Sequence, residues 1–181
     1  MGCGTSLKKT ATSPNERYIT GQQRMLVQRT WRYLAGDMTG IGSKVFIRIF
    51  ELYPNAKQLF PCRHKEGKEL LQDPNFKGHA SRFMQAVGAV VDNMDDLDTS
   101  LSPLLVGLGR QHINFNGFIP ENFDAFTKSM TLTWEEELKG HFTEEVKDAW
   151  KAVFNFIMIK LKEGFALASE ERDSLVPYDK H

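Results

Sequence analysis

The amino-acid sequence predicts an all-α fold, with about seven helices packed in one domain. Apolar residues recur at steps of three and four along most of the chain, which is the period of a helix with one buried face. No stretch shows the two-residue alternation of a half-buried strand, and no internal repeat is visible. The 181 residues, 41% hydrophobic and 25% charged, fit one globular domain with its own core.

The first half of the chain begins with a polar leader and continues with two helices. Residues 1–19 contain Ser, Thr, Gly and Pro without a period and are expected to form a flexible leader. One helix is predicted over 22–37 and a second over 42–53. Pro54 ends the second helix because proline cannot donate the next backbone hydrogen bond. The polar run 61–73 predicts a loop that contains one helical turn.

Four further helices follow, and each starts at a proline or a capping residue. Asp73 and Pro74 are a typical N-cap and first residue for a helix over 75–94. The other three begin near Pro103, Pro120 and Thr143 and are predicted over 104–112, 121–138 and 144–165. The polar residues 166–181 are expected to form a flexible C-terminal tail, which leaves 20–165 as the folded domain.

Composition excludes several classes of function. The 23 basic and 23 acidic side chains give a net charge of zero, whereas a nucleic-acid-binding surface normally needs a basic excess. No apolar run reaches the ~18–20 residues of a membrane-spanning helix, and residues 1–20 lack the apolar core of a secretory signal. Cys3 and Cys62 are the only cysteines, so no disulfide framework is expected. A cytoplasmic protein without a nucleic-acid partner is predicted.

The first nine residues, MGCGTSLKK, carry a pattern of their own. Gly2 and Ser6 match the N-myristoylation pattern, and Cys3 offers a thiol beside the acceptor for a second acyl chain. One myristoyl chain binds a membrane only marginally, so a second signal such as Cys3 or the pair Lys8-Lys9 is needed for stable anchoring. The alternative interpretation is an unmodified polar tail.

Two histidines are predicted on apolar helix faces. His79 follows Phe76 by three residues and precedes Phe83 by four, while His112 ends the row Leu104, Leu108, His112. A buried imidazole without a partner is costly, so each is either bonded to a backbone carbonyl or used as a ligand. A zinc site needs three or four ligands, and Cys62 and His64 are the only spare candidates, which argues against zinc. Two imidazoles between apolar walls favour haem, whose iron needs only axial ligands.

Four segments of the chain resemble the globin family. LYPNAKQLFP, with Pro54 and Phe60, looks like the globin corner whose Phe stacks on the haem. FKGHASRFM looks like the distal helix with His79 facing the ligand, and LLVGLGRQHINF like the proximal helix with His112 as the iron ligand. AWKAVFNFIMIKLKEGF is similar to the final globin helix. The resemblance covers roughly residues 20–165 and implies a globin-like fold of seven to eight helices around haem b.

The resemblance implies a role for each candidate residue. His112 would hold the iron, and its other N–H would reach a backbone carbonyl or hydroxyl of its own helix. His79 would either donate a hydrogen bond to bound dioxygen or itself occupy the sixth position. Arg82 would pair with a haem propionate, or else is a solvated surface side chain. The expected wall of the haem site consists of Phe60, Phe83, Val87, Leu108, Phe118 and Phe123.

Three functions follow as hypotheses. The first is reversible binding of dioxygen or another diatomic gas. The second is a membrane-tethered haem redox protein that transfers electrons, reduces nitrite or removes reactive oxygen, with a reductase as partner. The third is a helical adaptor without haem. The leader makes the chain most similar to the globin X-like, membrane-associated animal globins. In that branch Gly2 and Cys3 would carry the myristoyl and palmitoyl groups at the cytoplasmic face of the plasma membrane.

Overall fold

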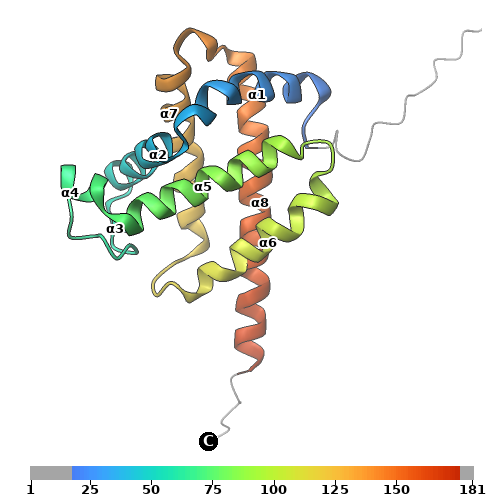
Figure 1. Ribbon diagram of the computed structural model, residues 1–181. Helices are drawn as coiled ribbons and strands as arrows, with labels where there is room; N and C mark the ends of the chain where they lie inside the picture. Colours follow the sequence, from blue (N-terminus) through green and yellow to red (C-terminus); the bar gives the residue numbers. More distant parts are fainter. Residues whose placement is uncertain (1–17, 176–181) are drawn as a thin grey trace, which may run out of the picture.

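The computed structural model describes residues 18–175, and these form an all-helical body without a strand in that range (Figure 1). The predicted fold class is confirmed. Six helices have ten or more residues, and two short ones, α3 and α4, lie in the segment between α2 and α5. Their bounds are α1 Gly21–Leu34, α2 Met38–Leu52, α3 Pro54–Lys57, α4 Gly67–Gln72, α5 Pro74–Asp92, α6 Ser102–Gln111, α7 Asp124–Leu138 and α8 Glu144–Ser174.

The helix starts follow local capping chemistry. The Thr20 hydroxyl accepts a hydrogen bond from the Gln23 backbone N–H, and Gln23 Oε1 accepts one from the Thr20 backbone N–H, which closes a capping box at α1. Asp73 caps α5 by accepting from the Phe76 backbone N–H at 2.9 Å, ahead of Pro74. The predicted start of the helix that carries His79 is therefore the observed one.

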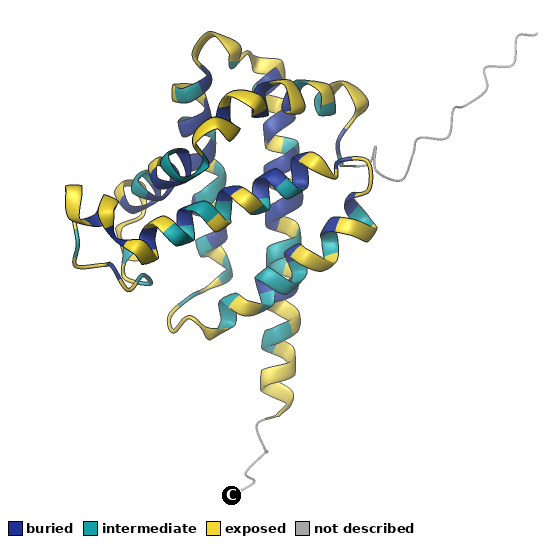
Figure 2. Ribbon diagram, viewed as in Figure 1, coloured by how far each residue is buried: buried dark blue, intermediate teal, exposed yellow. Residues whose placement is uncertain are grey.

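The core lies where α8 meets the other long helices. Figure 1 shows α8 running behind the molecule, with α5 and α6 crossing in front of it, and α6 and α1 both pack against it. A buried hydrogen bond joins α8 to α1, from Trp150 Nε1 to Thr30 Oγ1 at 2.9 Å. The inner faces of the helices are buried and their outer faces exposed, as expected for amphipathic helices around one core (Figure 2).

The C-terminal boundary differs from the prediction. Residues 166–174, expected to belong to a flexible tail, continue α8 as regular helix to Ser174. The run ALASEERDS is rich in Ala, Leu, Glu and Arg, which favour helix even where nothing covers them. This end of α8 stands clear of the body and is mostly exposed (Figure 2). The tail prediction is wrong for these residues.

None of the helices between residues 18 and 175 combines the length and apolar character needed to cross a membrane. Gly2 and Cys3, the predicted acylation sites, lie outside the described residues. Residues 1–17 of the predicted leader and the last six residues of the chain lie outside the described range as well. The leader prediction is wrong for its last two residues, because Ile19 is buried in the core and the Tyr18 ring packs on Phe156.

Candidate functional site

The C-terminal end of α6 holds His112 in a fixed orientation. Pro103 lies in the first turn of α6, and the helix buries Leu105 and Gly109 against the core, which turns His112 inward at its C-cap. The His112 Nδ1 lies 2.7 Å from the Leu108 carbonyl oxygen. Because a carbonyl can only accept, Nδ1 carries the proton and Nε2 presents a free lone pair. The predicted contact with the backbone of its own helix is present.

The middle of α5 presents the second imidazole. His79 packs edge-on against two aromatic rings, Phe46 at 4.7 Å and Phe60 at 5.1 Å between ring centroids. Within residues 18–175 no side chain or backbone group forms a hydrogen bond with the His79 ring. The two histidines are therefore held differently: His112 by a short hydrogen bond, and His79 by ring packing alone.

Both imidazoles are neutral at physiological pH. Burial, followed by the nearby charges of Arg82 and His112, lowers the pKa of His79 from 6.5 to about 4. Burial also lowers the pKa of His112, and its hydrogen bond to Leu108 offsets part of this shift. A metal ion binds the neutral imidazole, so the site keeps both rings in the form that can act as a ligand.

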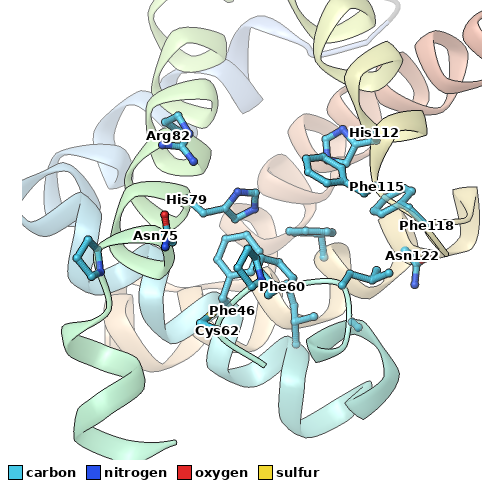
Figure 3. Close-up of a pocket in the computed structure, with 16 residues that line it drawn as sticks. Phe46, Phe60, Cys62, Asn75, His79, Arg82, His112, Phe115, Phe118 and Asn122 are labelled. Carbon is cyan, nitrogen blue, oxygen red and sulfur yellow. The ribbon is translucent and has the colours of Figure 1, made fainter. Parts of the chain in front are cut away.

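His79 and His112 point toward one another across a cavity (Figure 3), and a second cavity bordered by the same two histidines adjoins it. The first cavity has a volume of about 260 Å³ and the second about 290 Å³. Both are bordered by His79 and His112, and both reach the exposed side chain of Arg82. Together they have the size and the apolar lining of a site for a cofactor rather than for a single ion.

All nine residues predicted for the site border one or both cavities. Phe60 and Phe118 line the first cavity, and four lie around the second: Phe83, Val87, Leu108 and Phe123. The remaining three are the two histidines and Arg82. The structure therefore brings the predicted set together, while their contacts with a cofactor stay predictions.

Several wall residues were not predicted. Phe46 is fully buried and makes ring contacts with His79, Phe60, Phe83 and Phe126, so it forms the centre of the wall on the His79 side. The sequence contains a signal for Phe46, because the helix predicted over 42–53 is apolar on a second side. A helix that is apolar on two sides lies deep in the core. Phe126, Asn75, Asn122, Ile157 and Met158 also line the cavities.

On the His112 side, the ring of Phe118 lies 4.9 Å and that of Phe123 5.0 Å from the imidazole. Aromatic rings therefore line both sides of the site. In the part of the chain described here, no cluster of three or more His, Cys, Asp or Glu side chains could hold a bare metal ion. Two facing neutral imidazoles between aromatic walls fit a flat metal cofactor that needs only axial ligands, which is haem.

A family model described as Globin matches residues 43–161. The chain belongs to the globin family. Membership of this family implies haem binding, in agreement with the two facing imidazoles.

Among its relatives, this globin is 26% identical over 156 residues to neuroglobin of Tetraodon nigroviridis, covering 85% of this chain and 97% of that protein. It is also 26% identical over 149 residues to hemoglobin subunit mu of Homo sapiens, covering 81% of this chain and 99% of that protein. A solved hexacoordinated heme protein from an anhydrobiotic tardigrade, at pH 4, has the same fold. The TM-score is 0.78 at 24% identity, covering 83% of this chain and 98% of that chain.

Cys62 is the one described cysteine, and it borders the first cavity. Its side chain is buried, and this burial together with the charge of Asp73 raises the pKa of the thiol. A raised pKa disfavours the thiolate, which is the reactive form. Burial therefore makes the Cys62 thiol a poor nucleophile.

Proposed function

We propose that this globin binds a diatomic gas, dioxygen in the first place, on haem b held by His112, with His79 as a displaceable ligand opposite. The observation that carries this proposal is the unequal support of the two imidazoles. His112 is held by a 2.7 Å hydrogen bond, whereas His79 has ring contacts only. A ligand held by packing can leave at little cost. Neuroglobin and a protein titled as hexacoordinated heme protein, both similar to this chain, support the six-coordinate resting state.

Haem supplies a metal centre that accepts axial donors and diatomic gases and changes its charge by one electron. His112 offers Nε2 as the permanent donor because Nδ1 is bonded to Leu108. His79 offers a lone pair at rest. Once displaced, its ring N–H can donate a hydrogen bond to the gas. Because His79 competes with the gas, the apparent affinity is lowered by the fraction of the chain in the open form.

The remaining wall residues orient the cofactor. Arg82 borders both cavities, is exposed and has no ion pair within the described residues. We assign it to a propionate at the solvent edge of the haem. The aromatic side chains of Phe60, Phe83, Phe118 and Phe123, with Val87 and Leu108, line the cavities and would enclose the apolar faces of a bound haem. Phe83 is larger than the aliphatic residue usual in globins at this position and narrows the space available to larger ligands.

Absorption spectra of the hemin-loaded chain test the proposal. The ferric protein and the deoxygenated ferrous protein should both show six-coordinate spectra. His79→Leu should convert the ferrous spectrum to five-coordinate, and His112→Ala should strongly weaken hemin retention. His64→Leu, at an exposed histidine outside the cavities, is the matched control and should change neither. A His79→Leu spectrum identical to that of the unsubstituted chain would sink the distal assignment.

A redox role is the second candidate, because a chain that supplies both axial ligands can transfer one electron without changing its coordination. The facing imidazoles favour it. Exposure of the ferrous protein to carbon monoxide separates the two functions. Replacement of His79 by the gas supports gas binding, whereas a spectrum that stays six-coordinate through both histidines supports electron transfer with a reductase as the donor.

We further propose that the globin is tethered to the cytoplasmic face of the plasma membrane, as a globin X-like protein. The pattern of Gly2 and Ser6 and the adjacent Cys3 support this proposal, since two acyl chains give stable anchoring. In cell fractions, Gly2→Ala should release the protein from the membrane, and Cys3→Ser should weaken its retention. A Gly2→Ala protein that stays in the membrane fraction would exclude the anchor.

A further inference from the structure

The backbones of α6 and α8 cross in direct contact at two glycines. Gly109 of α6 and Gly164 of α8 are both buried. A Cβ on Gly109 would lie 2.1 Å from the Leu161 carbonyl oxygen, and a Cβ on Gly164 would lie 2.0 Å from the Val106 carbonyl oxygen. Gly109 thus packs on the carbonyl of Leu161, three residues before Gly164. In the same way, Gly164 packs on the carbonyl of Val106, three residues before Gly109.

No other residue type fits this crossing without moving a helix. Carbon and oxygen atoms in ordinary contact are about 3.5 Å apart, so a methyl group at either position requires a separation larger by more than about 1 Å. The obstructing atoms are helix carbonyls, which cannot rotate away as a flexible side chain can. The strain is therefore relieved by displacing α6 relative to α8.

His112 must follow any displacement of α6. It lies three residues after Gly109, and its Nδ1 is tied to the Leu108 carbonyl oxygen of the same helix. Metal–ligand distances tolerate only about 0.2 Å. A displacement of more than about 1 Å exceeds that tolerance several-fold, so the crossing determines whether Nε2 lies at bonding distance.

We propose that Gly109 and Gly164 are positioning residues for the proximal ligand, and that α8 sets the location of the His112 imidazole through them. The inference rests on the proposed binding of haem at His112. A second contact lies beside the crossing, where Arg110 and Glu171 form a two-pronged ion pair between α6 and α8. This pair is solvent-exposed and contributes little energy, so the glycine contact carries the positioning.

The test uses the full chain with His79→Leu, which leaves His112 as the sole imidazole ligand. Gly109→Ala and Gly164→Ala are introduced separately, because each adds a methyl group to the same contact from a different helix. If one variant does not fold, the other still tests the inference. Two properties are measured: the iron–imidazole stretching band of the deoxygenated ferrous protein, and the rate of hemin transfer to an acceptor apoglobin. We expect the band to fall in frequency and hemin loss to accelerate roughly 10–100-fold, the range for lost support of a metal ligand.

Two glycine controls separate positioning from general loosening. Gly107 lies on the same helix with nothing near its Cβ position, so Gly107→Ala should leave both properties unchanged. Gly88 lies on α5 with the Trp31 ring 3.0 Å from its Cβ position. Gly88→Ala should therefore lower the unfolding midpoint without moving the stretching band. A band shift in Gly88→Ala equal to that in Gly109→Ala would overturn the inference.

A second background tests the backbone link directly. In a chain with His112→Gly, imidazole added to the solvent replaces the side chain and is not attached to α6. In this chain Gly109→Ala should not move the iron–imidazole band. If Gly109→Ala and Gly164→Ala match Gly107→Ala throughout, the inference fails while the proposed function stands. If the unsubstituted chain takes up no hemin, both fail together.

Discussion

At the scale of single residues, the neutral state of His79 couples folding to pH. Its pKa in the folded chain is about 4, whereas an unfolded histidine titrates near ~6.5. Between these values the unfolded chain binds the additional proton. The free energy of unfolding therefore falls as the pH is lowered through this window, and the loss is complete below about pH 4. The whole shift corresponds to roughly 3 kcal/mol.

We expect the haem-free chain to lose roughly 2 kcal/mol of unfolding free energy through His79 between pH 7 and pH 5. Urea unfolding at the two pH values measures this loss. His79→Leu should show a smaller pH dependence by that amount, although His112 still contributes in the same direction. His64→Leu, at an exposed position, should keep the original dependence. An unchanged pH dependence in His79→Leu would mean that its imidazole is not buried in the neutral form.

The two histidines show what the sequence reveals at this scale. Both histidines were identified from the sequence because an imidazole is unusual on an apolar helix face. In the structure the two side chains belong to one site. The row that led to His112 was less accurate, since Leu104 is 46% exposed while its neighbour Leu105 is buried. A short helix offers few turns, so its buried face cannot be located to within one residue from the period alone.

At the scale of elements, the start of α5 joins the loop to the helix that carries His79. The Asp73 carboxylate accepts from the Phe76 backbone N–H and lies 2.8 Å from the Lys65 ammonium group, with only 6% of the Asp73 side chain exposed. The Lys65 hydrogen bond, followed by the backbone bond from Phe76, lowers the pKa of Asp73. One carboxylate thus caps the helix and fastens the loop to it.

Asp73→Ala should lower the free energy of unfolding by about 1–2 kcal/mol, because the cap is lost. Asp73→Asn should cost less, since an asparagine still caps the helix while the ion pair disappears. Chemical denaturation at pH 7 measures both changes. Asp92→Ala, at the opposite and exposed end of α5, is the matched control and should be nearly neutral. Equal losses in Asp73→Ala and Asp73→Asn would show that the ion pair, and not the cap, dominates.

At the scale of the whole molecule, the last turns of α8 lie outside the packed body. Most side chains of residues 166–174 are exposed, whereas Phe165 is buried. A chain that ends after Phe165 should therefore keep its unfolding free energy within about 1 kcal/mol, since it loses mostly exposed residues and the Arg110–Glu171 pair. Urea unfolding of the shortened and full chains checks this. A loss of several kcal/mol would show that these turns belong to the folded domain.

The overall fold was predictable because amphipathic periods, helix caps and prolines agree along the chain. The crossing of α6 and α8 was not predictable. Gly109 and Gly164 are far apart in the sequence, and nothing local indicates that their backbones touch. The end of α8 was misjudged for the opposite reason: a polar helix that projects into solvent has no apolar stripe, so periodicity cannot distinguish it from a tail.

The packing around Phe46 has a kinetic consequence. Its ring packs against the rings of Phe50, Phe60 and Phe76 and against His79, so aromatic packing restricts His79 on this side, while Arg82 borders the same cavity. In the six-coordinate state that we propose, an incoming gas molecule would have to wait until the His79 side chain moves aside. Higher gas pressure would then speed capture only up to a plateau, and the height of that plateau would report how often this one side chain opens.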